Sequence, residues 1–262
     1  MLPAYGDLTL TAAEGLRAAE PAACRAVALA PVDPEGHIAL ASVLLTGYDF
    51  RGALTALDAA LALDPSHATA HQRRGEALHA LGRMPEAEAA GRKALALDPL
   101  SAVINNALSY VYLGRPDNDE AIRLWRRAVA LEPDAYVWRA SLMIAYLVAR
   151  RSADAEAVAT GFDTSQVSRV IRRGLTDSTY APQARAALAI WRRTVPDGTA
   201  IPTSLLAWWY ARFGARDSAL VLLRRAVAER NPVFSKTLES SLWDPIRQDA
   251  RWGAPIDSLR KP

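Results

Sequence analysis

Four near-copies of one six-residue motif recur at a fixed interval along the first half of the chain. The motifs run from Ala26 to Pro31, from Ala60 to Pro65, from Ala94 to Pro99 and from Ala128 to Pro133, so their prolines are 34 residues apart each time. Self-similarity at a fixed period of this length is the signature of an array of equivalent units, each of which buries its apolar face only against its neighbours. The period therefore constrains the fold more than any other feature of the sequence.

Each unit has the pattern of two short helices separated by a turn. In residues 34–67, Asp33 can cap a first helix over about 34–46, and the proline that follows it is tolerated at the first helical position. A second helix is expected over about 52–63, where Asp64 and the next proline stop it, because proline cannot continue a helix. The inter-helix breaks recur in register in the next two units, so the sequence predicts a series of helix pairs.

Small residues recur in register in the second helices, where a larger side chain would hold the helix axes apart. They are Ala53, Ala87 and Ala121, followed by Ala60, Ala94 and Ala128. With large apolar residues such as Leu57 and Trp125 between them, this pattern resembles the tetratricopeptide repeat, a helix–turn–helix unit of about 34 residues. The second unit departs from the pattern twice, since Arg74 stands where the family prefers leucine and Gly91 where it prefers a large apolar residue.

The resemblance implies an all-α fold, an α-solenoid of stacked antiparallel helix pairs that forms a tetratricopeptide repeat superhelix. We expect about five to six repeats and a short C-terminal helical cap. The expected parts are a partial N-terminal repeat over 1–33, a regular array over 34–162 with units 34–67, 68–101, 102–135 and 136–162, an irregular helical insert over 163–199, a late repeat over 200–233 and a cap over 234–262. Within the insert, helices are expected near 165–174 and 181–193.

The C-terminal tail carries a second resemblance. Residues Leu242 to Trp252 are similar to a closing segment that follows such repeats in bacterial regulatory proteins. In those proteins the repeats usually follow a winged-helix DNA-binding domain, an adenylyl cyclase, a Ser/Thr kinase or a TolB-like region, and none of these has a counterpart in this sequence. We therefore expect the chain to correspond to the repeat half of such a protein.

The resemblance also implies that the first helices line a concave face, which suits an extended or helical segment of another protein. We therefore expect a non-enzymatic protein-interaction module, a sensory or scaffold part of a bacterial signalling or transcriptional system. The groove residues predicted from the helical period are Gln72, Arg73, Glu76, His79, Asn106, Tyr110, Ile144 and Trp208. Within this set, Arg73, Asn106 and Tyr110 could hold a carboxylate or a backbone segment, and the alternative is an ordinary solvated face. The first helices contain no lysine, so a full lysine-based carboxylate clamp is not expected.

Five arginine pairs are the basis of the alternative function, a nucleic-acid-associated regulator that uses arginines of the second helices. They are Arg126-Arg127, Arg150-Arg151, Arg172-Arg173, Arg192-Arg193 and Arg224-Arg225. The formal net charge is only +3, and several pairs lie near helix C-termini, where cations complement the helix dipole, so a solvated face is the favoured interpretation. An enzyme site in the 163–199 segment is a third possibility, but no base or nucleophile forms a motif with Asp163, Asp177 or Asp197.

No metal or cofactor is expected. His67 and His71 have a spacing that can place two ligands on one helical face, but His67 falls in a turn and no cysteine or carboxylate completes a set. The one cysteine, Cys24, lies on an alanine-rich helix and is expected to be a packing residue. The N-terminus has no signal-peptide pattern, and the apolar stretch Ala140 to Val148 is too short to span a bilayer. A cytoplasmic protein is expected, or an extracytoplasmic one if an upstream membrane anchor precedes the chain, and the oligomeric state stays open.

Overall fold

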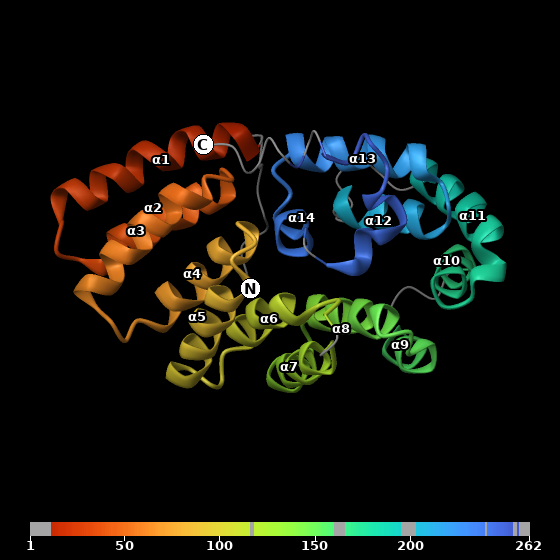
Figure 1. Ribbon diagram of the computed structural model, residues 1–262, viewed down its shortest axis with the longest axis horizontal. Helices are drawn as coiled ribbons and strands as arrows, with labels where there is room; N and C mark the ends of the chain where they lie inside the picture. Colours follow the sequence, from red (N-terminus) through yellow and green to blue (C-terminus); the bar gives the residue numbers. More distant parts are fainter. Residues whose placement is uncertain are drawn as a thin grey trace, which may run out of the picture.

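The computed structural model describes residues 12–115, 118–159, 166–194, 203–238, 240–253 and 256. Within these residues the regular secondary structure is helical, with no β-strand. The helices stack as successive pairs along a curve (Figure 1). This arrangement confirms the prediction of an all-α solenoid built from helix pairs.

The helices follow the repeat period closely. A single helix, α1 (Ala12–Leu29), precedes four pairs, which are α2 (Pro34–Thr46) with α3 (Phe50–Leu63), α4 (Ala68–Ala80) with α5 (Met84–Leu97), α6 (Ala102–Tyr112) with α7 (Asn118–Leu131), and α8 (Tyr136–Val148) with α9 (Ser152–Ala159). The chain continues with α10 (Gln166–Thr176), η1 (Ser178–Tyr180), α11 (Ala181–Thr194), α12 (Thr203–Arg212) and α13 (Arg216–Ala228). The cap consists of α14 (Pro232–Thr237), η2 (Ser241–Trp243) and α15 (Asp244–Arg247).

The segment in which we expected an irregular insert contains a further helix pair. Helices α10 and α11 pack against each other, and α10 also contacts α9. Residues 163–165 and 195–199 of this segment, with Asp163 and Asp197, lie outside the described residues, as do residues 1–11 of the expected partial repeat. The stacking of helix on helix thus runs from α9 into α11.

Side chains cap the first helices of successive repeats, as the sequence pattern indicates. Asp33, His67 and Ser101, which are 34 residues apart, each accept a hydrogen bond from a backbone N–H in the first turn of the helix that follows. Such caps satisfy N–H groups that have no partner within the helix. At the other end of the pair, Asp64 leaves α3 in an extended conformation because a proline follows it. Local sequence therefore sets where each pair begins and ends.

The in-register alanines lie at the centre of the packing within each pair. Ala53, Ala60, Ala87, Ala94, Ala121 and Ala128 are all completely buried. A small side chain at a helix contact lets the two axes approach, and larger neighbours such as Leu57 and Trp125 fill the remaining space. The pairs bury these residues by stacking, in one large apolar cluster that runs from Leu54 to the cap and a smaller one at α2, α3 and the start of α4.

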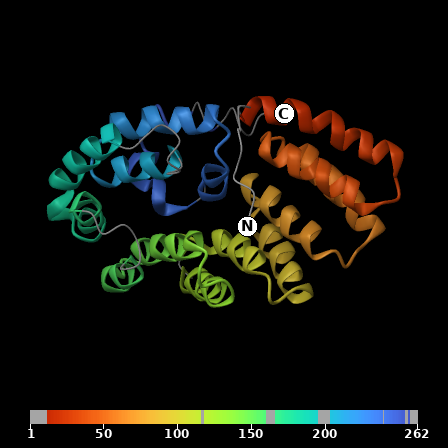
Figure 2. The same cartoon turned by 180° about the vertical axis from the view of Figure 1, so that it is seen from behind.

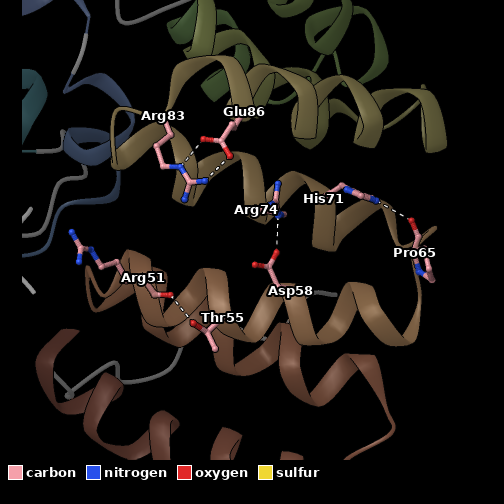
Figure 3. Close-up of polar contacts among 8 residues, drawn as sticks. All are labelled: Arg51, Thr55, Asp58, Pro65, His71, Arg74, Arg83 and Glu86. Atoms are coloured by element: carbon pink, nitrogen blue, oxygen red, sulfur yellow. Dashed lines mark hydrogen bonds and ion pairs between the residues drawn. The ribbon is translucent and has the colours of Figure 1, made fainter.

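The two departures from the repeat pattern have separate physical explanations. Arg74 on α4 donates through Nε to Oδ1 of Asp58 on α3 at 2.8 Å, so the position expected to hold leucine carries an ion pair between neighbouring repeats (Figure 3). Gly91 leaves space that Leu108 of the next repeat fills, since a Cβ atom at position 91 would lie 2.6 Å from Leu108 Cδ1. Both departures are therefore accommodated by a residue of a neighbouring repeat.

The curve brings the early and late repeats together, and the cap lies inside it (Figures 1 and 2). The turn between α2 and α3 meets the turn between α13 and α14, where the hydroxyl of Tyr48 donates to the backbone carbonyl of Asn231. Helix α14 contacts α4, α6 and α12, while η2 packs on α12 and α15 packs on α12 and α13. The cap thus connects the two ends of the array across its concave side.

Candidate functional site

Two rows of residues follow from the repeat period on the inner side of the first helices. The first row is Gln72, Asn106, Ala140 and Ser204, and the second is Glu76, Tyr110, Ile144 and Trp208. We call these eight residues the concave face. In each row the residues lie on α4, α6, α8 and α12 in turn, and the first three are 34 residues apart. All of the predicted groove residues except Arg73 and His79 belong to these rows.

The centre of the concave face holds a lysine of the cap. Nζ of Lys236 on α14 lies 2.9 Å from Oε1 of Glu76 and 5.9 Å from the centroid of the Tyr110 ring. The other carboxylate oxygen of Glu76 accepts from Nη1 of Arg73 at 3.1 Å. The Glu76 side chain is only 10% exposed, so this ion pair forms largely out of water. The same ammonium group is therefore held by neighbouring members of one row, a carboxylate from α4 and an aromatic ring from α6.

The charges in this cluster stabilise one another. Burial alone would raise the pKa of Glu76, but Lys236 and Arg73 outweigh it and hold this pKa below its usual value. Burial would likewise lower the pKa of Lys236, yet the nearby Glu76 carboxylate raises it above its ordinary value. Burial lowers the pKa of His79 to about 4, so its imidazole is neutral at pH 7. The concave face thus presents one ionised, buried carboxylate to an ammonium group.

Asn106 and Tyr110 are fixed by the second helix of their own repeat. Oδ1 of Asn106 accepts a hydrogen bond from the indole Nε1 of Trp125 at 2.9 Å. The Tyr110 ring meets the same indole edge to face, with centroids 5.2 Å apart. Together with Arg73, these residues formed the group predicted to hold a carboxylate. In the structure Arg73 pairs with Glu76, Asn106 bonds to Trp125 and Tyr110 faces Lys236, so each of the three side chains has a partner within the chain.

The rest of the concave face is mostly covered. Gln72 is 3% exposed and Trp208 5%, while Ile144 is partly buried against the main apolar cluster. His79, which lies outside the two rows, is 4% exposed. Ser204 donates through Oγ to Oδ1 of Asn231, the residue just before α14, at 2.9 Å. The structure thus brings together Glu76, Tyr110, Arg73 and Ser204 around the cap and leaves Ile144 beside it.

Sequence reasoning missed Lys236 and Asn231. Both follow the last repeat, in a region with no 34-residue register from which a facing residue could be derived. The sequence does offer one signal for Lys236, which is the rarity of lysine in this chain. The chain has 28 arginines but only three lysines, and one of those three is Lys236.

Five arginines of the pairs make contacts within the array that can be named. Arg126 donates to the hydroxyl of Tyr146, Arg127 to the carbonyl of Pro99, and Arg151 and Arg225 form ion pairs with Asp154 and Glu229, while Arg173 lies over the ring of Tyr180. The side chains of Arg192 and Arg193 lie outside the described part of the chain. Arg126 thus connects α7 with α8, whereas the ion pair of Arg225 joins residues only four positions apart.

The histidines also have structural partners. Nε2 of His71 lies 2.9 Å from the carbonyl of Pro65 (Figure 3), and His37 makes the same contact with Pro31 in the preceding repeat. His67 caps α4 through Nδ1 and places Nε2 2.9 Å from Glu35. In the ranges that the structure describes, no group of three or more histidine, cysteine, aspartate or glutamate side chains could hold a metal ion.

Two further predictions concern Cys24 and membrane-spanning helices. Cys24 is exposed, contrary to the expectation that it packs, since α1 rests on α2 with one side only. Among the helices that the structure describes, none combines the length and the hydropathy needed to cross a membrane.

Comparison with known proteins agrees with this architecture. Residues 38–102 match the family model of the tetratricopeptide repeat. A tetratricopeptide repeat protein from Parabacteroides merdae is similar in structure, with 13% sequence identity and a TM-score of 0.60 over 86% of this chain and 93% of that one. PilF of Pseudomonas aeruginosa is similar at 20% identity and a TM-score of 0.52, over 79% and 95% of the two chains. No curated protein matches the sequence at a significant level. Residues 38–102 are thus tetratricopeptide repeats by sequence, and the chain as a whole has the fold of the tetratricopeptide repeat proteins.

Proposed function

We propose that the chain is a non-enzymatic protein-interaction module that binds a segment of another protein on its concave face. One observation carries the proposal. The concave face already holds a protein segment, the chain's own cap, through an ion pair to Glu76, a ring contact with Tyr110 and a hydrogen bond from Ser204. A face that recognises a helical segment in this way has the side chains needed to recognise another.

The two helices of each repeat have different roles, and this difference is the physical basis of the proposal. The second helices and the in-register alanines hold each pair together, and the inner positions of the first helices are not among the residues that the repeat pattern prescribes. On α4, α6, α8 and α12 these positions carry polar, aromatic and aliphatic side chains in two rows. Such a surface can combine apolar contact with a few directed polar contacts, which is how grooves of stacked helices select peptides.

The setting of this function is also part of the proposal. The similarity of Leu242 to Trp252 to the closing segment of bacterial regulatory proteins supports a sensory or scaffold role in a bacterial signalling system. A cytoplasmic location agrees with that role.

Site-specific photo-cross-linking in the native host tests the proposal. p-Benzoylphenylalanine is placed at Ala140, a partly buried member of the first row on α8, and, as a matched control, at Ala153, which is exposed on α9 of the same repeat. We expect a cross-linked partner protein from position 140 and none of the same mass from position 153. The same products from both positions, products from position 153 alone, or none from either would contradict binding at the concave face.

A further inference from the structure

The cap follows a defined path across the inner side of three repeats. Asn231 bonds to Tyr48 at the turn between α2 and α3, and Lys236 reaches Glu76 and Tyr110 on the next two first helices. Further on, the cap lies against the turn between α6 and α7, where a Cβ atom on Gly114 would come within 2.7 Å of the backbone nitrogen of Ser241. Residues 231–238, 240 and 241 thus cross the early repeats in the manner of a bound peptide.

The residues of this segment differ in chemistry. Phe234 within it is completely buried in the main apolar cluster, its ring centroid lies 5.6 Å from that of Trp243, and Trp252 packs on Trp243 at 5.7 Å. The contact with the early repeats at the centre of the segment is polar and consists of Lys236 with Glu76 and Tyr110. The Lys236 side chain can therefore turn away from Glu76 and Tyr110 while Phe234 stays in the core.

The residue type at the centre of the contact is itself informative. Arginine outnumbers lysine by 28 to three in this chain, and most of the other internal ion pairs use arginine as the cation. A lysine presents one compact ammonium group with three donors, whereas an arginine presents a wide planar fork. The space between the Glu76 carboxylate and the Tyr110 ring is filled by the compact group.

We propose that the segment 231–238 is the resident ligand of the concave face through Lys236, and that the partner displaces the Lys236 side chain by presenting a lysine of its own to Glu76 and Tyr110. The proposal rests on the proposed function and specifies the chemistry of the partner, a protein segment with a lysine at its centre of contact. Because the resident segment is tethered, it competes at an effective concentration in the millimolar range. A partner therefore binds the intact chain more weakly than it binds a chain whose own lysine has been removed from the site.

Binding of a synthetic peptide to full-length chains tests this competition. The probe is a fluorescein-labelled peptide of residues 229–243, and binding is followed by fluorescence anisotropy. In a Lys236→Glu chain, the resident segment places a carboxylate opposite Glu76, so the side chain at position 236 is repelled and Glu76 and Tyr110 become available. We expect the peptide to bind this chain at least tenfold more tightly than it binds the parent. A Lys236→Met chain removes the charge without repulsion and takes the place of Lys236→Glu if circular dichroism shows that the latter is unfolded.

Two changes test whether lysine is the group that is recognised. A peptide carrying Lys236→Met should bind the Lys236→Glu chain at least tenfold more weakly than the parent peptide does. The parent peptide should also lose at least tenfold on a chain that carries Glu76→Gln in addition to Lys236→Glu. The matched control is Glu88→Gln in the same background, since Glu88 is an ion-paired glutamate on the second helix α5 and its loss should leave binding unchanged.

Equal binding of the peptide to the parent and Lys236→Glu chains would overturn the resident-ligand proposal. Equal binding of the parent and Lys236→Met peptides would overturn lysine recognition. The photo-cross-linking experiment at Ala140 is independent of both results. A partner captured there by a chain that does not distinguish the two peptides would leave the proposed function standing and remove only the inference about lysine.

Discussion

Lowering the pH should destabilise the chain through His79. This side chain lies on α4 one turn beyond Glu76, is 4% exposed, and has a pKa lowered to about 4 because burial disfavours its charged form. In the unfolded chain the pKa is the ordinary 6.5. Between these values the unfolded chain holds a proton that the folded chain does not, so the free energy of unfolding falls as the pH falls. From about pH 7 to about pH 4.5 the loss is about 2 kcal/mol.

Urea unfolding followed by circular dichroism, at several pH values across this range, measures the loss. The matched variant His79→Leu keeps a side chain of comparable size in the site and removes the titrating group, so its unfolding free energy should change little between the same limits. Glu76 acts at lower pH, because a carboxyl with a lowered pKa begins to lose its stabilising effect only as the pH falls below its ordinary value of 4.5. A parent whose stability is constant over this range, or an equal loss in the parent and His79→Leu, would refute the reasoning.

Three substitutions in the array test its packing. Gly114→Ala places a side chain at a φ of +80° and against the backbone of the cap, so it should destabilise the chain by about 2 kcal/mol or more, measured as a lower urea midpoint. Trp125→Phe leaves Oδ1 of Asn106 buried without its donor and should cost about 1–3 kcal/mol in the same assay, whereas an unchanged midpoint would deny that hydrogen bond a structural role. Arg74→Leu restores the residue that the repeat pattern prefers and breaks only a half-exposed pair with Asp58, so thermal unfolding should show a stability within about 0.5 kcal/mol of the parent.

The sequence was sufficient to predict the helix pairs because their signals are local. Asp33 and the proline after it fix the start of α2, and Asp64 with the next proline fixes the end of α3, each within a few residues of the signal itself. The in-register alanines likewise indicate where two helices touch, since their spacing repeats with the unit. The glycine at position 91 could not be explained from the sequence, because the side chain that fills the space beside it is a leucine of the following repeat.

The sequence also predicts which residues share the inner side of the first helices, but it does not predict that the cap lies against them. A helical period places Glu76 and Tyr110 on the same side of successive first helices, whatever that side contacts. Lys236 comes from a segment outside the repeats and reaches these residues only because the whole array curves back toward its beginning. That curvature is the sum of small rotations between units, which no single unit encodes. The predicted groove residues therefore include Glu76 and Tyr110, whereas the segment that lies against them was not predicted.

Zero-length cross-linking tests most directly whether the cap occupies the concave face. A carbodiimide joins a carboxylate and an amine that are in contact, and Oε1 of Glu76 lies 2.9 Å from Nζ of Lys236. Since the chain has only three lysines, mass spectrometry after proteolysis can assign each lysine product to Lys93, Lys236 or Lys261. We expect an amide between Glu76 and Lys236 in the parent chain, reduced in yield when an excess of the 229–243 peptide competes for the site. Cross-links from Lys236 to other carboxylates, with none to Glu76 in a chain that circular dichroism shows to be folded, would contradict the placement of the cap on the concave face.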